Sequence, residues 1–289
     1  MKITVYKSSA FVKSRKGGNT AGIVLDADFL TEDYMKRIAA ILGFSETAFV
    51  MKSDCANFKV RFFTPIEEVA LCGHATIGTF YTLANQGYIK PGHYLQETKA
   101  GVLHIEIKKD LSIMMNQTTP KFYEIINKEE IAASLNITIA DILEDLPVQI
   151  VSTGLKDIMI PVKTMELLNS ISPNFAKIKE ISKKYNVIGY HVFALEGPSN
   201  SNALCRNFAP LYEIPEESAT GTSNGALGCY LFEYGKLDCT QAENIVFAQG
   251  YSLNRPSEIL VSLTVERNKI SEVKVGGKTL QLSIVEVEI

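Results

Sequence analysis

The chain contains one short motif twice, and this repetition limits its possible folds more than any other feature of the sequence. Arg61-Phe62-Phe63-Thr64-Pro65 and Arg206-Asn207-Phe208-Ala209-Pro210 both read Arg-x-Phe-x-Pro, and the two copies begin about half of the 289-residue chain apart. Each copy alternates like a strand and ends in a proline, which stops a strand. The repeat indicates that one structural unit has been duplicated.

A glycine that opens an apolar, helix-like run follows each copy of the motif. The first run extends from Gly73 to Gly87 and the second from Gly221 to Gly235, so the two have the same length. A helix that is apolar on nearly every side is a buried helix. We therefore expect an α+β fold with two pseudo-twofold-related domains, each a curved, mostly antiparallel sheet or barrel around a central helix.

The length agrees with this duplication. At roughly 150 residues per domain, 289 residues suggest about two domains. No Pro/Gly/Ser-rich linker separates two halves. We expect an N-terminal domain of residues 1–118 plus 279–289 and a C-terminal domain of residues 119–278, with the active site in the cleft between them.

Local patterns predict several individual elements. Alternation of apolar and polar residues predicts strands at Phe58–Phe63, Val102–Ile107, Ile259–Val265 and Leu280–Ile289. Three further segments are typical of helices: Thr31–Leu42, Lys128–Leu135 and Ile171–Tyr185. The first of these has a Thr cap, acidic residues in its first turn and Gly43 at its end.

Charge and hydropathy argue against several classes of function. The net charge is −3, from 29 basic and 32 acidic residues, and no basic stretch indicates nucleic-acid binding. No apolar run approaches the ~20 residues of a membrane helix. The N-terminus alternates like a strand and has no apolar signal core. We expect a cytoplasmic protein that binds neither nucleic acid nor membrane.

The cysteines and histidines do not show the spacing of a metal site. The five cysteines have no CxxC or CxxH spacing, and none of the four histidines is paired at a ligand spacing. A disulfide framework and structural zinc are therefore not expected, and we expect neither a metal nor a cofactor. The cysteines other than Cys72 fall on strand or helix patterns and are expected in the core: Cys55, Cys205, Cys229 and Cys239.

The two central helices begin with residues suited to anion binding. The unpaired N–H groups of a helix N-terminus carry about half a positive charge and attract anions. The segments Cys72-Gly73-His74 and Thr220-Gly221-Thr222 place a glycine at each beginning, where a ligand can approach the backbone closely. Either segment alone could be an ordinary cap. As a pair facing a cleft, they would bind a carboxylate or a developing enolate.

Three side chains near the first helix are candidates for proton transfer. His74 has a suitable pKa range, although a lone histidine is more often structural. Glu46 stands at the entry of an apolar strand, where burial would raise the pKa of its carboxyl; the alternative is a solvated carboxylate. Cys72 is a thiol at a helix N-terminus or, alternatively, a small buried apolar residue.

Two acidic residues precede the second helix. Glu216 and Glu217 could complement its dipole, or one of them could face the site. Thr220 occupies the position that corresponds to Cys72, so a reaction between two opposed thiols is not available.

Six motifs, in order, resemble the PhzF-like (phenazine-biosynthesis-like) isomerase family of the diaminopimelate-epimerase fold superfamily. They cover most of the chain: Gly18-Asn19-Thr20-Ala21-Gly22-Ile23-Val24-Leu25, Ser45-Glu46-Thr47-Ala48-Phe49-Val50, Arg61-Phe62-Phe63-Thr64-Pro65, Leu71-Cys72-Gly73-His74-Ala75-Thr76, Ala219-Thr220-Gly221-Thr222-Ser223-Asn224-Gly225, and Gln249-Gly250 with Arg255-Pro256-Ser257.

The resemblance implies cofactor-free proton chemistry at the domain interface, and commonly a homodimer. The family's glutamate that moves a proton between carbons of a dihydro-hydroxyanthranilate matches Glu46. Its other polar site residues match His74, Glu217 and Thr222. The backbone N–H groups around Gly73 and Gly221 would bind the substrate carboxylate.

The chain departs from the family pattern at three places. The usual Asp-Pro before the second Ala-Thr-Gly is Glu217-Ser218 here, so the acid is one methylene longer. Thr222 stands where the family usually has Ser, and Thr20 stands where Gly-Asn-Pro is usual. The resemblance does not imply the phenazine substrate itself, because the size and lining of the site come from loops.

Sequence and resemblance together favour an isomerase or epimerase that moves a proton on a small carboxylate, with Glu46 as general acid/base. Two alternatives stay open at this stage. One is a one-thiol epimerase or dehydratase that uses Cys72 as the base. The other is a non-catalytic dimeric binding or scaffold protein that retains an ancestral site, to which the altered Glu217 lends weight.

Overall fold

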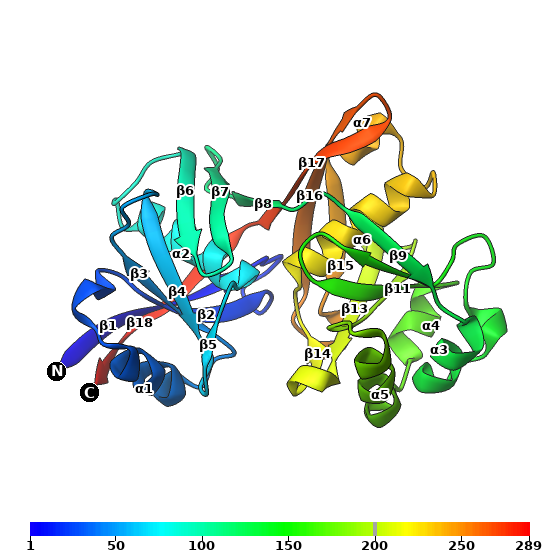
Figure 1. Cartoon of the computed structure of the whole chain (residues 1–289), viewed down its shortest axis with the longest axis horizontal. Helices are drawn as coiled ribbons and strands as arrows, with labels where there is room; N and C mark the ends of the chain where they lie inside the picture. The colour runs from blue at the N-terminus through cyan, green and yellow to red at the C-terminus, as the bar shows by residue number, and fades with distance from the viewer. Residues whose placement is uncertain (199–200) are drawn as a thin grey trace. The chain divides into compact units, whose positions relative to one another are not determined.

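The chain divides into two compact units in a computed structural model that describes residues 1–198 and 201–289. Unit 1 comprises Met1–Asn116 and Gly276–Ile289, and unit 2 comprises Gln117–Val275 (Figure 1). The domain limits expected from the sequence lie within three residues of these boundaries. The C-terminal segment of the chain is therefore part of the unit that the N-terminus begins.

Unit 1 is made mostly of strands. Its elements are β1 (Lys2–Ala10), β2 (Asn19–Val24), η1 (Ala27–Phe29), α1 (Glu32–Leu42), β3 (Thr47–Met51), β4 (Phe58–Phe63), β5 (Glu68–Val69), α2 (Gly73–Asn85), β6 (Gly92–Thr98), β7 (Gly101–Ile107), β8 (Ile113–Gln117) and β18 (Thr279–Glu288).

Unit 2 has a similar set of strands and more helices. Its elements are β9 (Lys121–Ile125), α3 (Lys128–Leu135), η2 (Ile139–Asp141), β10 (Gln149–Ser152), β11 (Lys156–Val162), α4 (Met165–Ser170), α5 (Phe175–Tyr185), β12 (Gly189–Ala194), β13 (Ala203–Ala209), η4 (Pro210–Tyr212), β14 (Ile214–Glu217), α6 (Gly221–Glu233), α7 (Cys239–Ala242), β15 (Ile245–Gln249), η5 (Tyr251–Leu253), β16 (Ser257–Glu266) and β17 (Lys269–Gly277).

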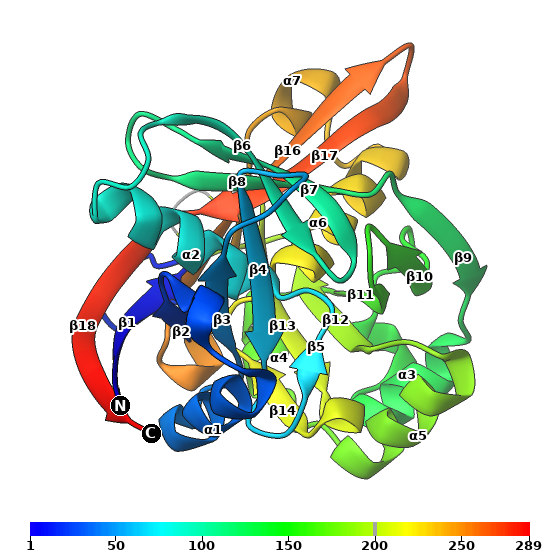
Figure 2. The same ribbon diagram turned by 60° about the vertical axis from the view of Figure 1, so that its left-hand side comes forward.

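The strand pairings confirm the duplication. In unit 1, β1–β2, β3–β4, β4–β5 and β6–β7 are antiparallel, whereas β2–β3 and β4–β6 are parallel. In unit 2, β10–β11, β12–β13, β13–β14 and β15–β16 are antiparallel, whereas β11–β12 and β13–β15 are parallel. The order and the directions agree strand for strand. A further antiparallel strand pairs with β1 in unit 1 and with β10 in unit 2: these strands are β18 and β9 (Figure 2).

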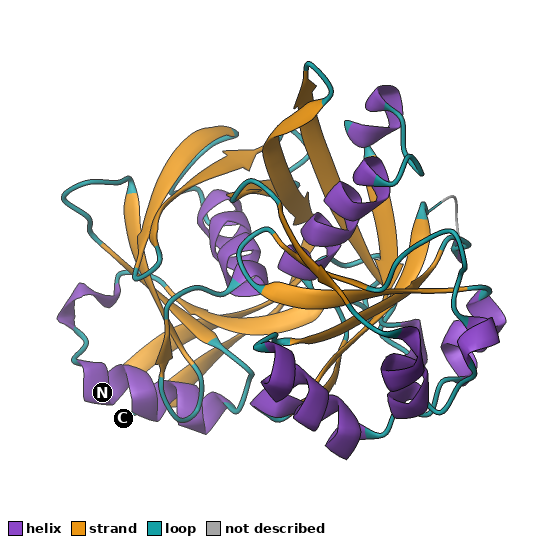
Figure 3. Cartoon of the chain, turned by 45° about the vertical axis from the view of Figure 1, so that its right-hand side comes forward, coloured by secondary structure: helices purple, strands orange, loops and turns teal. Residues whose placement is uncertain are grey.

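Each unit encloses one apolar helix, as the repeat predicts. Helix α2 contacts β1, β2, β3 and β18, and α6 contacts β10, β11 and β16 (Figure 3). Most of the residues of both helices are buried. The outer faces differ: α3, α4 and α5 pack a large core onto the unit 2 sheet, whereas α1 and η1 form a smaller core in unit 1.

Capping residues explain where the helices begin and end. Thr31 accepts a hydrogen bond from the main-chain N–H of Tyr34, and Gly43 ends α1 at φ 65°. The prediction that a helix begins at Ile171 is wrong, because α5 begins at Phe175. Pro173 disfavours helical conformation in the residue before it, and Asn174 then caps the new helix by accepting from the main-chain N–H of Lys177.

The expectation that four cysteines lie in the core is half correct. Cys205 and Cys229 are buried, but Cys55 and Cys239 are exposed. Cys55 lies in the connection after β3, and Cys239 begins the short helix α7, so both are at the surface of their units. Among the described residues, no helix has the length and apolar character needed to cross a membrane.

Candidate active site

The N-terminus of α2 gathers three of the predicted site residues. Cys72 is extended at φ −139° and ψ 117°, and the helix begins at Gly73. His74 and Cys72 are only 6 % and 7 % exposed. Glu46 immediately precedes β3, and its Oε2 lies 3.3 Å from Nε2 of His74. The buried start of α2 therefore brings a carboxyl, an imidazole and a thiol together.

Asn19 of β2 determines how the His74 ring is used. Its Nδ2 lies 3.3 Å from Nδ1 of His74, and an amide nitrogen can only donate. Sγ of Cys72 lies 3.4 Å from the same ring nitrogen. Nδ1 is therefore the acceptor of the neutral ring, and the ring proton is on Nε2, on the side of Glu46.

The Glu46 oxygen in this cluster has no hydrogen bond. Within the part of the chain that the structure describes, Oε2 is buried and lacks a hydrogen-bond partner, although His74 Nε2 is near. A buried unpaired acceptor costs free energy. Catalytic hydrogen bonds are often poorly aligned until substrate binds, and an unpaired carboxylate oxygen is a suitable proton acceptor.

The same three side chains could also bind a metal ion. One ligand atom from each of Glu46, Cys72 and His74 lies within 4.8 Å of the other two. A Cys, His and carboxylate set is typical of zinc. Proton transfer by Glu46 and metal ligation by Glu46 use the same oxygen atoms, so the two roles exclude each other.

The N-terminus of α6 gathers the remaining predicted residues in unit 2. Thr220 precedes the helix, and its Oγ1 donates to Oε2 of Glu217 at 3.2 Å. Gly221 is buried and begins the helix. The main-chain oxygen of Thr222 accepts from Oγ1 of Thr153 at 3.2 Å. The structure therefore places Glu217, Thr220 and Thr222 at one helix terminus.

Glu216 has a structural role. Its carboxylate accepts from Nε and Nη2 of Arg206 at 2.9 and 2.8 Å. Nη1 of the same arginine donates to the main-chain oxygens of Leu168 and Ile171 at the end of α4. Glu216 is thus bound to Arg206 on the outer face of the sheet. Of the two acidic residues, Glu217 is the one that lies at the start of α6.

A buried polar network supports the α6 terminus, and the sequence alone does not predict most of its members. Burial raises the pKa of Asp157 to about 7, although Ser223 donates to it at 2.5 Å. Burial lowers the pKa of His191 to about 4, against the effect of its hydrogen bond with Asn224. Asn19 and Gln249 were visible only as parts of motifs, and no spacing pattern indicates His191 or Asp157.

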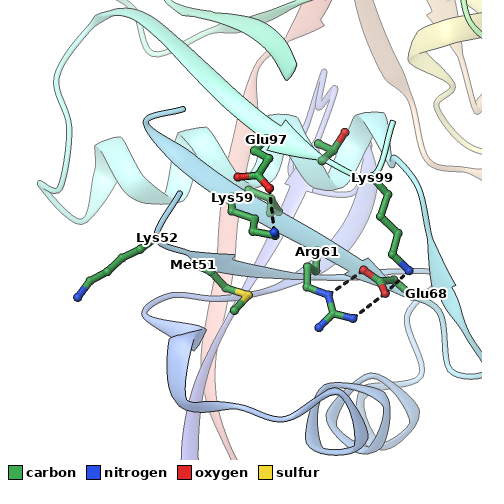
Figure 4. A pocket seen from close by; sticks show the side chains of 9 residues that line it. Met51, Lys52, Lys59, Arg61, Glu68, Glu97 and Lys99 are labelled. Atoms are coloured by element: carbon green, nitrogen blue, oxygen red, sulfur yellow. Dashed lines mark hydrogen bonds and ion pairs between the residues drawn. The ribbon is translucent and has the colours of Figure 1, made fainter. Parts of the chain in front are cut away.

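A separate hollow of about 530 Å³ lies on unit 1 and is lined from β3, β4, β5 and β6. Figure 4 shows ion pairs among most of its charged side chains, whereas Lys52 points away from them. Arg61 and Lys99 both contact Glu68, and Lys59 contacts Glu97 at 2.8 Å. The residues that line the hollow include none of the predicted site residues, so it is distinct from the cluster at α2.

Comparisons with known proteins agree with this architecture. The family model described as "Phenazine biosynthesis-like protein" matches residues 8–283. An uncharacterized isomerase of Clostridium acetobutylicum is 36 % identical, over 96 % of each chain. The crystal structure of a PhzF-family phenazine biosynthesis protein from Bacillus anthracis has a TM-score of 0.91 and 33 % identity, over 100 % of both chains.

More distant relatives extend the comparison. A trans-2,3-dihydro-3-hydroxyanthranilate isomerase of Pseudomonas chlororaphis is 26 % identical, over 93 % of each chain. A hydroxyproline epimerase from Agrobacterium vitis has a TM-score of 0.63 at 13 % identity, over 99 % of this chain and 91 % of that one, and so shares the fold. The chain belongs to the PhzF, or phenazine-biosynthesis-like, family of isomerases.

Proposed function

We propose that the protein is a cofactor-independent isomerase that moves a proton on a small carboxylate, with Glu46 as the general acid/base. The observation that supports this most is the buried, unpaired Oε2 of Glu46 at 3.3 Å from His74 Nε2. No hydrogen bond in the described residues uses that oxygen, although Nε2 of His74 is near, so it can accept a proton from a substrate C–H.

The reaction needs no external proton source. Glu46 as carboxylate removes a proton from a carbon next to an unsaturated or carbonyl-like group, and the electron pair moves into that group. The resulting carboxylic acid returns a proton to another carbon, so the charge balances, and while Glu46 holds the proton it can exchange with solvent. The proton on Nε2 of His74 offsets negative charge on Glu46, and the N–H groups around Gly73 stabilise the charge on the substrate.

The α6 terminus would provide the second group of substrate contacts. Glu217, Thr220 and Thr222 offer a carboxylate and two hydroxyls, and Gly221 lets a ligand approach the backbone. We propose that Glu217 and Thr222 bind polar substituents of the same substrate, and that Thr220 contributes through its contact with Glu217. The related isomerase of Pseudomonas chlororaphis is named for trans-2,3-dihydro-3-hydroxyanthranilate, which makes that compound the first to test. We also propose a homodimer, which sedimentation would test.

A second assignment rests on Cys72. Its Sγ lies 3.4 Å from Nδ1 of His74, so the imidazole could take the thiol proton and leave a thiolate as the base. We rank it second because Nδ1 already faces the Asn19 amide nitrogen, and that donor competes for the same lone pair.

Deuterium incorporation separates these assignments. trans-2,3-Dihydro-3-hydroxyanthranilate is incubated in D₂O with the wild type, Glu46→Gln, Cys72→Ala and the control Glu97→Gln, and followed by NMR. Removing a general acid/base lowers a rate about 10²–10⁴-fold, and we expect such a loss in Glu46→Gln alone. EDTA should leave the wild-type rate unchanged if Glu46 binds no metal.

Two results would contradict the proposal. Loss in Cys72→Ala with retention in Glu46→Gln would transfer the role to the thiol. Loss of the wild-type rate with EDTA, restored by Zn²⁺, would make the three-residue cluster a metal site.

A further inference from the structure

A chain of buried polar side chains leads through unit 2 to Glu217. It starts on β13 and β12, passes through α6 and β15, and ends at the residue before α6. Its inner members are 0–2 % exposed. In order, the chain consists of Asn207, His191, Asn224, Gln249 and Thr220.

Main-chain groups fix the orientation of the Gln249 amide. Its Nε2 donates to the main-chain oxygen of Glu217 at 2.8 Å, which can only accept. Its Oε1 accepts from the main-chain N–H of Thr220 at 3.2 Å, which can only donate. The amide cannot be turned over without losing both bonds.

This orientation determines where the Thr220 hydroxyl proton points. The Nε2 of Gln249 also donates to Oγ1 of Thr220 at 3.1 Å. Because Oγ1 accepts there, its own proton is available for the carboxylate oxygen Oε2 of Glu217, 3.2 Å away. The hydroxyl therefore donates to Glu217, and a hydrogen-bond donor favours the ionised form of a carboxyl.

Asn224, which precedes Gln249 in this chain of side chains, also donates in the direction of Glu217. Nδ2 of Asn224 donates to the main-chain oxygen of Thr220 and to Oε1 of Gln249, both at 2.8 Å. Its Oδ1 is then left to accept from Nε2 of His191 at 3.4 Å.

The same direction of donation continues at His191. The second nitrogen of the neutral His191 ring, Nδ1, must accept, and Nδ2 of Asn207 lies 3.2 Å from it. The side-chain hydrogen bonds that link successive members of the chain therefore all donate in the direction of Glu217, and Asn207 Nδ2 also donates to Oγ of Ser223 at 3.2 Å.

The guanidinium of Arg206 is used elsewhere and is not part of this chain of hydrogen bonds. The arginine lies on β13 next to Asn207, but its Nε and Nη2 bind Glu216 and its Nη1 binds main-chain oxygens of α4. Its guanidinium is therefore used on the other face of the strand. The hydroxyl of Thr220, in contrast, lies 3.2 Å from Oε2 of Glu217.

We propose that Gln249 is a positioning residue that acts through Thr220 to hold Glu217 as an ionised hydrogen-bond acceptor for the substrate. This inference rests on the proposed function, in which Glu217 contacts the substrate. It predicts that the hydroxyl of Thr220 and the amide of Gln249 act as one unit, and that Glu217 accepts a hydrogen bond from an amino or hydroxyl group of the substrate.

The kinetic experiment uses trans-2,3-dihydro-3-hydroxyanthranilate with the full-length protein. Thr220→Val and Gln249→Leu should each lower kcat about 10–100-fold, the size seen when a supporting hydrogen bond is lost, with KM changed less than about threefold. The double variant should be no slower than either single variant, because residues that act as a unit are not additive. Thr220→Ser, which keeps the hydroxyl, should recover kcat to within about fivefold of wild type.

Gln96→Leu is the matched control. Gln96 is also fully buried, but it lies on β6 of unit 1 and its Nε2 donates to Thr76 at 3.2 Å. The variant should lose stability and keep kcat. If Gln249→Leu does not fold, Thr220→Val and Thr220→Ser carry the test.

An NMR measurement tests the geometry without substrate. In ¹⁵N-labelled wild type, both side-chain amide protons of Gln249 should exchange slowly with water. In Thr220→Val, the proton donated to residue 220 should exchange faster, whereas the proton donated to the Glu217 main chain should not. Equal exchange of both protons in wild type and variant would overturn the hydrogen-bond assignment.

The outcomes separate the two proposals. Wild-type turnover in Glu46→Gln rejects the proposed function, and the NMR result then decides whether the hydrogen-bond chain exists. An inactive Glu46→Gln together with wild-type kcat in Thr220→Val, or additive losses in the double variant, rejects the positioning role alone.

Discussion

The two buried histidines differ most in what their Nε2 atoms meet. In both rings Nδ1 faces an asparagine amide nitrogen, Asn19 for His74 and Asn207 for His191. Nε2 of His191 meets the neutral amide of Asn224, whereas Nε2 of His74 meets the Glu46 carboxyl. An amide is not a base, whereas a carboxylate can act as a general base. The His191 arrangement is therefore suited to holding neighbouring side chains in place, and the His74 arrangement is suited to proton transfer.

Asp157 and His191 should oppose each other in the pH dependence of stability. The raised pKa of Asp157, about 7, stabilises the fold below its unfolded value near 3.8, and this is lost as pH rises through 7. The lowered pKa of His191, about 4, stabilises the fold above its unfolded value near 6.5, and this is lost as pH falls. Between about pH 4 and pH 6.5, Asp157 binds one proton on folding and His191 releases one. Their opposite effects on the pH dependence of the free energy of unfolding therefore cancel.

The variant Asp157→Asn should show the pH dependence of stability that is due to His191 alone. Its free energy of unfolding should fall by about 1.4 kcal/mol per pH unit, relative to wild type, as pH decreases from about 6.5 toward 4. Above pH 7 it should be more stable than wild type, because no buried carboxylate must ionise. Urea denaturation at pH 4.5 to 8 measures this, and parallel curves for the two proteins would refute it.

The sequence indicated the reactive groups of the candidate site better than their supports. Glu46, Cys72 and His74 were predicted and lie together. Asn19, which orients His74, was noted only as part of a turn motif, because nothing in the sequence separation of residues 19 and 74 encodes the contact. Side chains that support a site through tertiary contacts do not have the regular spacing that a helix or strand imposes.

At the level of elements, the repeated Arg-x-Phe-x-Pro motif is a brace between strands. Arg61 lies over the ring of Phe63 at 5.0 Å, and Arg206 lies over Phe208 at 4.9 Å. Each arginine also binds the glutamate of the next strand, Arg61 with Glu68 and Arg206 with Glu216. Since both units need this brace, the motif marks the duplicated fold and not the catalytic site.

The two braces should differ in their contribution to stability. Side chains of Arg206 and Glu216 are 9 % and 10 % exposed, and Arg206 also binds the end of α4. Arg206→Ala would leave a buried charge unpaired and should cost about 3–5 kcal/mol. Arg61 is 20 % exposed and Lys99 also pairs with Glu68, so Arg61→Ala should cost about 1–2 kcal/mol.

Urea denaturation of both variants measures this difference. Matching Arg→Lys variants control for loss of the side-chain stem. An Arg61→Ala cost as large as that of Arg206→Ala would contradict the assignment.

The limits of helices and strands were predicted correctly where the residues that determine them lie close together in the sequence. The predicted limits of Phe58–Phe63 and Lys128–Leu135 equal those of β4 and α3, because the alternation lies within β4 and the capping residues Asn127 and Asn136 directly flank α3. The start of α5 was missed because the apolar Ile171 fits a helical pattern, although it lies at the C-terminal end of α4. Periodicity does not distinguish one helix from two that follow each other closely.

For the molecule as a whole, unit 1 depends on the last strand. β18 pairs with β1 from Lys2–Glu288 to Ala10–Thr279, and Val287 belongs to the unit 1 core. A chain ending at Lys278 should therefore lose protection from hydrogen exchange in β1 and β2, because β1 would lose one of its two neighbours.

Hydrogen exchange followed by mass spectrometry tests this dependence. Residues 117–275 should keep wild-type protection in the shortened chain, and deleting Ile289 alone provides the control. Wild-type protection of β1 in the shortened chain would contradict the prediction.

The position of β18 also has a consequence for biosynthesis. Domains generally fold as they emerge from the ribosome, the N-terminal one first. Here the strand that completes the N-terminal unit follows Val275, the end of unit 2, in the sequence. All of unit 2 is therefore translated before β1 receives its partner β18. The unit made first is the one that matures last.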